Sequence, residues 1–498
     1  MANLKSLAKD TVIYGFTGMV GRFLNYLLVP LYTAKISAAS GGYGIVTNIY
    51  AYIALLIIIL TFGMETTFFR FSNKDDEDPK SVISTSLIAV AAVAALFVAL
   101  IFITLPWLAP AMGYGDHPSY ISVMAIVVAL DAVQSILYAY LRYQHRPIKF
   151  ATLKFAFIIL NILLNLLYFV WLPNLYKSYP EVIGKIYDPT VGVGYAFYLN
   201  LVCTGLVTFL FWKELTGIKY KMDWALLKRM LSYTWPLLLL GIVGILNQTA
   251  DKILYPYIDP SHNGKVQLGI YGAACKIAMI MAIITNAFRW AYEPFVFGKS
   301  RDKDNREAYA SAMRYFIIFT YIAFLMVMAW MDILKYIIGR DYWEGLKVVP
   351  IVMAAEIMMG IYFNLSFWYK LTDKTIWGAI FSFIGCAVLV AINFIFVPKF
   401  GYWACAWGGF TGYGISMVLC YFVGRKYYPI DYPLKDIAIY TLLTAAIFAV
   451  YCFVDFGITW ANITFRTALL LVFFAVLVKM EHLEPMLKRI PGIGKYIK

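Results

Sequence analysis

Long hydrophobic stretches alternate with short polar connections along the chain. Clusters of charged residues, proline and glycine separate these stretches, and a helix of about 20 apolar residues crosses the hydrocarbon core of a bilayer. The residue-by-residue alternation typical of membrane β-strands is absent. The pattern predicts an all-α integral membrane protein with about fourteen transmembrane helices. The expected spans are 11–33, 43–69, 81–105, 119–141, 150–172, 190–212, 231–255, 268–293, 312–331, 347–369, 376–397, 402–423, 436–454 and 460–478.

The composition agrees with this pattern. Hydrophobic residues make up 62% of the chain and charged residues 14%, with a mean hydropathy of +0.72. A soluble domain has roughly 45–50% apolar and about 25% charged residues. The 498 residues are almost all used by the expected spans and their connections. A separate soluble domain is therefore not expected.

The positive charges indicate the orientation in the membrane. The net charge is +14, and Lys and Arg gather in alternate connections, such as 70–80, 142–154, 213–229 and 299–314. Cation-rich connections stay in the cytoplasm under the positive-inside rule. We therefore expect both termini in the cytoplasm and no nucleic-acid partner. The first apolar run lacks a clear cleavage site, so we expect it to remain as a span.

Motifs for catalysis or metal binding are missing from the sequence. The six cysteines lie in apolar runs without a CxxC pair, which indicates buried small side chains. There is no HExxH motif, nucleophile elbow or carboxylate cluster in a large loop. We expect no enzyme, no catalytic residue, no metal site and no cofactor, apart from Na⁺ or H⁺ as a coupling ion.

Two parts of the chain resemble each other. The segment MVGRFLNYLLVPLY aligns with GIVGILNQTADKILYPY, and a short loop and a glycine-led helix follow each. The two segments begin six predicted helices apart, so the repeats are parallel. The alternative is chance similarity between apolar helices. We predict two pseudo-symmetric six-helix lobes around a central cavity, with two added helices: 1–229, 230–430 and 431–498.

Polar residues inside the spans are candidates for a transport pathway, because such groups usually face a cavity or a partner. At about 100° per residue, Tyr14, Arg22 and Asn25 share one face of the first span. Asp131 and Gln134 share a face of the fourth span. The alternative is an interhelical hydrogen bond or a buried ion pair. The predicted substrate-binding residues are Tyr14, Arg22, Asn25, Gln134 and Lys276.

Membrane acids are candidates for binding a coupling ion. We predict this role for Asp131, Asp251 or Glu356. Asp251 precedes Lys252 near the outer end of its helix, so a structural or gating role is equally open there.

Other charged residues suggest structural roles. Arg289 and Glu293 are four residues apart and are predicted to form an ion pair. Glu65 is interpreted in the same way, with Arg70. Arg466 is expected to extend outward to the membrane surface.

Several segments resemble bacterial polysaccharide repeat-unit flippases of the Wzx type, which belong with lipid II flippases and multidrug and toxic compound extrusion transporters. They are LAKDTVIYGFTGMVGRFLNYLLVPLYT, YGIVTNIYAYIALLIIILTFGMETTFFRF, ADKILYPYI, LGIYGAACKIAMIM and AFRWAYEPFVF. The resemblance is strongest over residues 1–300 and implies a V-shaped bundle. Arg22 lies where related lipid II flippases have a basic cavity residue. The resemblance supports the same role for Lys276 less closely. The last two helices, 436–478, would form a groove for a lipid tail.

The resemblance implies that the protein moves an undecaprenyl-pyrophosphate-linked oligosaccharide from the cytoplasmic to the periplasmic leaflet by alternating access. Its expected setting is the bacterial inner membrane, in surface polysaccharide biosynthesis such as that of the O-antigen of lipopolysaccharide. A polymerase and a chain-length regulator are expected partners of a monomer. The alternatives are an ion-coupled multidrug exporter and a scaffold for polysaccharide assembly. Arg22 and Lys276 favour the flippase, because a drug exporter should have an acidic cavity.

Overall fold

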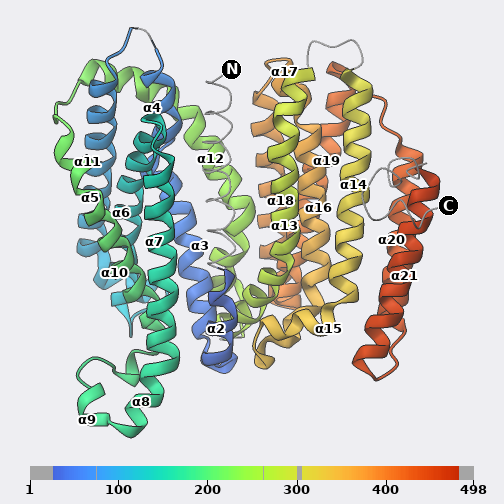
Figure 1. The fold of residues 1–498 in the computed structure, drawn as a ribbon, viewed down its shortest axis with the longest axis horizontal. Helices are drawn as coiled ribbons and strands as arrows, with labels where there is room; N and C mark the ends of the chain where they lie inside the picture. The colour runs from blue at the N-terminus through green and yellow to red at the C-terminus, as the bar shows by residue number, and fades with distance from the viewer. Residues whose placement is uncertain (1–25, 75, 262, 300–304, 482–498) are drawn as a thin grey trace. The chain divides into compact units, whose positions relative to one another are not determined.

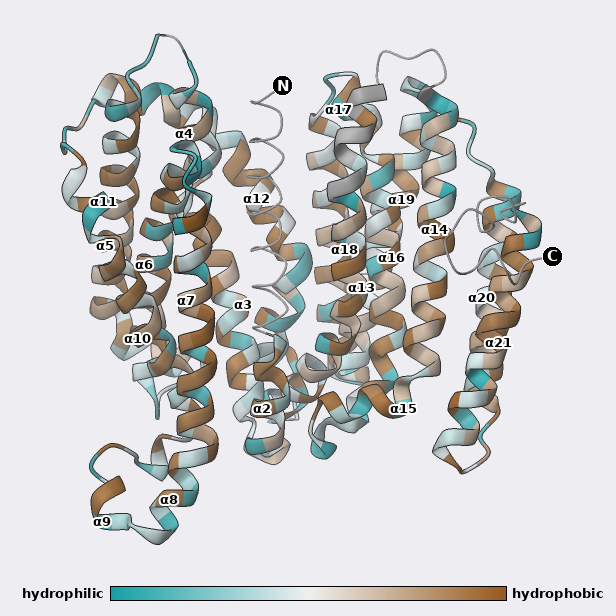
Figure 2. Ribbon diagram, viewed as in Figure 1, coloured by the Kyte–Doolittle hydropathy of each residue, from teal (hydrophilic) through white to brown (hydrophobic). Residues whose placement is uncertain are grey.

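The computed structural model describes residues 26–74, 76–261, 263–299 and 305–481, with backbone only at 290–291, 293–295, 297–299 and 305. Within these residues, thirteen helical segments are long and apolar enough to cross a membrane. Each corresponds to one of the expected spans from the second onward. The first expected span, 11–33, lies mostly outside the described residues. The protein is an all-α, multi-pass membrane protein, and Figure 2 shows hydrophobic residues along the middle of helices such as α5, α7 and α18.

The chain packs as two compact units that divide between Ala273 and Ala274, inside α13. This division is defined by the contacts between residues. The predicted lobes 1–229 and 230–430 are defined by a sequence repeat and stay a prediction. The first unit holds α2 (Leu28–Lys35), α3 (Gly42–Thr61), α4 (Met64–Ser72), α5 (Pro79–Ala111), α6 (Pro118–Tyr143), α7 (Pro147–Leu166), α8 (Leu172–Ser178), α9 (Pro180–Ile183), α10 (Tyr195–Leu210), α11 (Trp212–Gly217), α12 (Trp224–Ile258) and the start of α13 (Gly264–Lys299) (Figure 1).

Helix α6 lies at the centre of the first unit. Its buried residues Val128, Ala132, Ile136 and Ala139 recur at steps of three or four, so they form one stripe of the helix. This stripe belongs to a hydrophobic core to which α5 also contributes. The small alanines allow close helix contact, which matters in a membrane because helix association there depends on packing.

Glycines bring α3 close to the start of α13. A Cβ added to Gly44 would lie 1.7 Å from the carbonyl oxygen of Lys265, and one added to Gly269 would lie 2.9 Å from the Gly44 nitrogen. Only glycine fits at either position. Asn48 Nδ2 of α3 also donates to the Lys252 carbonyl of α12 at 2.8 Å. The contact between Gly44 and Gly269 joins the two glycine-led segments that the sequence repeat relates.

The second expected span is broken near its end. Phe62 and Gly63 both have positive φ, 37° and 75°, and separate α3 from α4. The left-handed conformation ends one helix and starts another. Glu65 therefore lies in the first turn of α4, where the helix dipole favours a negative charge.

The second unit contains the rest of α13 and the helices that follow it. They are α14 (Asn305–Ala329), α15 (Met331–Leu334), α16 (Val349–Leu365), α17 (Phe367–Leu371), α18 (Ile376–Phe400), α19 (Tyr402–Tyr427), α20 (Leu434–Phe453) and α21 (Thr459–Met480) (Figure 1). Helices α18 and α19 approach closely at Gly385 and Gly412. A Cβ on either glycine would lie within 2.8 Å of the other's carbonyl oxygen. This is the small-residue packing typical of membrane helices.

Candidate transport sites

Charged residues gather on one face of α6 in the first unit. Asp131, Tyr138 and Arg142 are spaced by seven and four residues, so they share this face. Lys154 of α7 lies against it: its Nζ is 3.9 Å from the Tyr138 ring centroid, and it attracts Asp131 electrostatically. Asp131 therefore faces a basic group inside its own unit.

The same face of α6 ends in an ion pair. Arg142 Nη2 donates to Glu65 Oε1 of α4, and the Arg142 guanidinium also lies over the Phe69 ring. The expected pairing of Glu65 with Arg70 is wrong, because Arg70 instead stacks on Tyr233 of α12 at 4.0 Å. The turn at Phe62–Gly63 directs Glu65 towards α6, which sequence spacing does not reveal.

Gln134 is buried in the first unit. Its Nε2 donates to the Thr204 carbonyl at 3.0 Å and to Thr208 Oγ1 at 2.8 Å, both on α10. Nearby, Asn200 Nδ2 donates to Tyr50 Oη at 2.6 Å. These contacts favour a role for Gln134 in joining α6 to α10. Its predicted contact with substrate stays a prediction.

Neighbouring side chains compensate the negative charge of Asp251. It is 6% exposed, accepts a hydrogen bond from Tyr271 Oη at 2.6 Å, and lies 3.1 Å from Lys252 Nζ. A carboxylate with these two partners has its charge and lone pairs satisfied. This geometry favours the structural alternative for Asp251 over ion binding.

The remaining predicted residues divide into two groups. Tyr14, Arg22 and Asn25 lie outside the described residues, as does the side chain of Glu293. Lys276 and Glu356 are half-buried, and neither is without an interaction partner. Arg289 stacks on Phe363 at 4.8 Å, so its described contact is with an aromatic ring. Its ion pair with Glu293 stays a prediction.

Two charged groups were missed by the sequence analysis. Lys154 was assigned to a cytoplasmic connection, although it shares a face of α7 with Asn161 and Asn165 at steps of seven and four, which was the available signal. Glu214, with a side chain only 3% exposed, binds both Arg146 at 2.9 Å and Lys149 at 2.5 Å. A buried carboxylate needs such partners, because its desolvation is costly.

An apolar groove of about 830 Å³ lies between α20 and the helices α14, α16 and α19 in the second unit. We call it the α20 groove. Its walls include Phe324 of α14, Ile357 of α16, Trp407 of α19 and Phe448 of α20. Almost all of this lining is hydrocarbon or aromatic, so the groove suits an apolar chain rather than a sugar.

One face of α20 forms a wall of this groove. Leu434, Ile437, Thr441, Thr444 and Phe448 follow one another at steps of three or four and all line it. Thr441 Oγ1 shares a hydrogen bond of 2.8 Å with Tyr321 of α14, which satisfies its hydroxyl. The stripe is therefore mainly apolar, although the buried Thr444 Oγ1 has no hydrogen-bond partner among the residues that the structure describes.

Two ion-pair clusters attach α20 and α21 to the unit at opposite ends of the hairpin. We call these clusters clasps. In the first clasp, Arg314 of α14 lies 3.3 Å from Glu481 and 3.7 Å from Asp436. Tyr440 also donates to Glu481, whose side chain is 2% exposed.

In the second clasp, Arg466 of α21 lies 2.9 Å from Asp332 of α15 and donates to the Tyr451 carbonyl at 3.2 Å. The expectation that Arg466 extends outward to the membrane surface is wrong, since its side chain is 13% exposed and paired. The two clasps leave the α20 groove between them.

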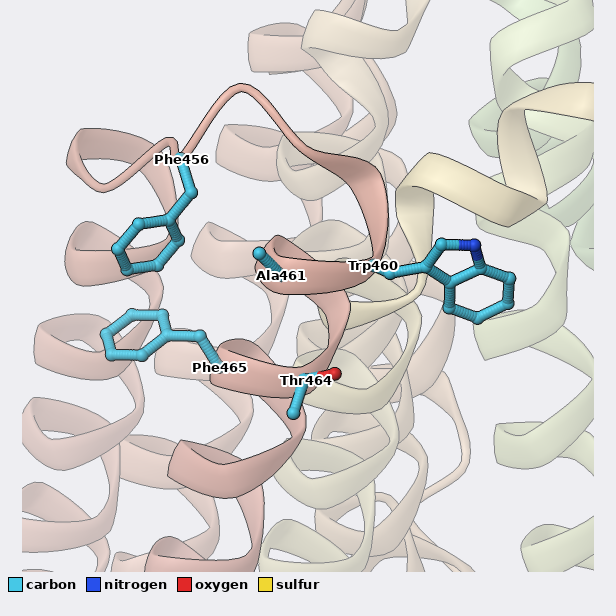
Figure 3. Close-up of a pocket in the computed structure, with 5 residues that line it drawn as sticks. All are labelled: Phe456, Trp460, Ala461, Thr464 and Phe465. Atoms are coloured by element: carbon cyan, nitrogen blue, oxygen red, sulfur yellow. The ribbon is translucent and has the colours of Figure 1, made fainter.

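A further hollow of about 460 Å³ lies where α20 turns into α21. Figure 3 shows the Phe456 and Phe465 rings on one side of the turn and Trp460 directed the other way. The two phenyl rings are 5.3 Å apart and nearly perpendicular. These side chains form a shallow aromatic surface, of which Trp460 is the residue type enriched at membrane interfaces.

The comparison with protein families covers more than half of the chain. The family described as "Polysaccharide biosynthesis protein" matches residues 7–294. The chain belongs to this family. No curated protein sequence matches it.

Solved structures show the same fold at low sequence identity. The lipid II flippase MurJ in an inward closed conformation has a TM-score of 0.71 and 16% identity, over 94% of this chain and 99% of that one. An inward-facing multidrug resistance MATE family transporter of the MOP superfamily has a TM-score of 0.61 and 16% identity, over 84% and 97%. The outward-facing form of such a transporter has a TM-score of 0.53 and 15% identity, over 84% and 95%. The chain thus shares its fold with these transporters.

Proposed function

We propose that this protein is a flippase for undecaprenyl-pyrophosphate-linked oligosaccharide repeat units. It would move them from the cytoplasmic to the periplasmic leaflet of a bacterial inner membrane, for a surface polysaccharide such as the O-antigen. The observation that carries the proposal is the α20 groove in a chain of the polysaccharide biosynthesis family. Both termini would be cytoplasmic, as the distribution of Lys and Arg suggests.

The proposed mechanism treats the two ends of the substrate differently. A sugar chain that crossed hydrocarbon alone would lose hydrogen bonds at a cost of about 4–8 kcal/mol for each uncompensated polar group. A polar pathway replaces water for the sugars, while the polyprenyl tail lies in the α20 groove. Rocking of two halves would then give alternating access.

The anionic head group would bind basic residues. Arg22 is the first candidate, because a guanidinium offers a planar fork that matches phosphate oxygens. Lys276 of α13 is the second. Asn25 and Tyr14, on the same predicted face as Arg22, would contact sugars or phosphate through hydrogen bonds.

Coupling to an ion gradient would involve Asp131 rather than Asp251. Asp251 already has Lys252 and Tyr271 as partners. Asp131 faces Lys154, whose ammonium opposes the uptake of either cation, H⁺ or Na⁺, at the same carboxylate. We propose H⁺ as the coupling ion because a proton needs one carboxylate oxygen and no further ligands, with Glu356 as the remaining candidate residue.

Small-molecule export is the second candidate function, because MATE transporters share this fold. The basic side chains Lys154 and Lys276 argue against cationic drugs as substrates. The proposed flippase would work as a monomer, with a polymerase and a chain-length regulator as partners.

The test places a bulky side chain in the α20 groove. Ala445 lines it, whereas the neighbouring Ala446 does not. Ala445→Trp should abolish translocation of an undecaprenyl-pyrophosphate-linked sugar in proteoliposomes, scored by the access of a membrane-impermeant lectin. Ala446→Trp, the matched control, should remain active at equal protein abundance. Equal activity of both variants would refute a tail site in the groove, and drug efflux without sugar translocation would favour the exporter.

A further inference from the structure

A second apolar cavity adjoins the α20 groove at a single shared side chain. This cavity, of about 640 Å³, lies between α18 and α19, and its walls include Phe396, Phe400 and Thr411. Trp407 lines both this cavity and the α20 groove. We call the second space the α18–α19 cavity.

The position of Trp407 on α19 explains why it lines both spaces. At about 100° per residue, Phe410 and Met417 lie on one side of it and line the groove. Ala404 and Thr411 lie on the other side and line the α18–α19 cavity. Trp407 thus forms the ridge between them.

The indole of Trp407 packs against one aromatic neighbour and is otherwise partly exposed. Its ring is 5.2 Å from the Phe410 ring, in an edge-to-face arrangement at 78°. The residue is nevertheless 48% exposed. The ring is therefore held on its groove side, while much of its surface remains able to contact a ligand.

The length of the groove sets a limit on the chain that it holds. Its α20 wall runs from Leu434 to Phe448, which at 1.5 Å per residue is about 21 Å. A farnesyl chain fits this length, whereas an extended undecaprenyl chain is much longer. A long tail in the groove must fold back, leave into lipid or continue beyond Trp407.

We propose that the distal part of a long polyprenyl tail crosses Trp407 and occupies the α18–α19 cavity, so that Trp407 determines selectivity for tail length. This inference rests on the proposed flippase function. It follows from the continuity of two apolar spaces at one half-exposed aromatic ridge. A short chain ends in the groove and does not contact the second cavity.

The test compares two chain lengths on the full protein in nanodiscs. Undecaprenyl phosphate and farnesyl phosphate are the probes, with a phosphatidic acid as the ordinary-lipid control. Trp407→Ala removes the ridge, and Thr411→Phe fills the second cavity. Each should weaken binding of undecaprenyl phosphate by about tenfold, the effect of 1.4 kcal/mol. Binding of farnesyl phosphate should stay near the wild-type value in Thr411→Phe, and should weaken less than that of undecaprenyl phosphate in Trp407→Ala, because Trp407 also lines the groove.

The control variant is Phe394→Ala. Phe394 is an exposed aromatic residue of α18 that lines neither space, so both affinities should be unchanged. Equal losses for the two probes, or no loss in Trp407→Ala and Thr411→Phe, would overturn the role of the second cavity while leaving the tail site intact. Wild-type protein that prefers phosphatidic acid to both prenyl phosphates would overturn the tail site as well.

Discussion

Arg466 of α21 and Asp332 of α15 form an ion pair, with 2.9 Å between Nη1 and Oδ2. The two residues are 134 positions apart in the sequence. Together with the cluster of Arg314, Glu481 and Asp436, this pair attaches the last helical hairpin at both ends. The α20 groove lies between the two attachments.

Breaking the second clasp should destabilise the hairpin. Both side chains are less than a quarter exposed, at 13% and 24%, so Asp332→Asn or Arg466→Gln should each cost about 1–2 kcal/mol. Thermal unfolding in detergent measures the loss. The double variant should cost less than the sum of the two single ones, because they remove the same interaction. Lys399→Gln, at an exposed position, is the control, and strictly additive losses would contradict the clasp.

Replacing Asp131 and Asp251 should distinguish a role in ion coupling from a structural role. Asp131→Asn should remove the dependence of transport on a pH gradient, since the amide cannot exchange a proton. Asp251→Asn should leave this dependence but lower thermal stability by about 1–3 kcal/mol, because Lys252 loses its buried partner. Transport in vesicles under imposed H⁺ and Na⁺ gradients is the measurement. Unchanged gradient dependence in Asp131→Asn would exclude this residue as the coupling site.

Arg22 should matter for export and not for folding. Charge-assisted contacts to phosphate contribute about 1.5–3 kcal/mol, so Arg22→Ala should reduce polysaccharide export roughly tenfold or more at normal membrane abundance. Arg22→Lys should fall between, because an ammonium lacks the planar fork. If Arg22 instead pairs with Asp131, the single variants should lose stable protein and a neutral double replacement should restore it. Normal export by Arg22→Ala would refute the head-group contact.

The turn between α20 and α21 should open at acidic pH. Asp455 accepts hydrogen bonds from Asn462 Nδ2 at 2.7 Å and from the Gly457 N–H at 2.8 Å, and these lower the pKa of its carboxyl below the ordinary value of 3.8. A depressed pKa stabilises the turn above the ordinary value, and this contribution is lost as the pH falls through the lowered one. The Gly457 amide should therefore lose protection from hydrogen exchange as the pH falls through this lowered pKa, after correction for the intrinsic pH dependence of exchange. Asp455→Asn keeps an acceptor and should abolish this pH dependence.

The orientation of the chain can be checked with reporter fusions. A fusion at residue 185 should report the periplasm, and one at residue 300 the cytoplasm, as the positive-inside rule indicates. The opposite result, or the same side for both, would refute the predicted topology. Either outcome is independent of the identity of the substrate.

The sequence by itself determined the membrane class and the positions of the spans. Hydrophobic length is a local property, and the thickness of the bilayer fixes how many apolar residues a helix needs. Hence the thirteen spans among the described residues match the expected ones, with differences of at most about seven positions at either end. The shared face of Asp131 and Gln134 on α6 was also visible in the sequence, because it depends only on helical periodicity.

Only the tertiary structure decided which charges meet and where space remains. Glu65 pairs with Arg142, 77 residues away, rather than with nearby Arg70, because a turn at Phe62–Gly63 reorients it. Arg466 similarly finds Asp332 rather than the membrane surface. The α20 groove depends on how four helices separated in sequence are spaced and rotated. Periodicity specifies the face of each helix but not its neighbour, and neighbours determine both ion pairs and cavities.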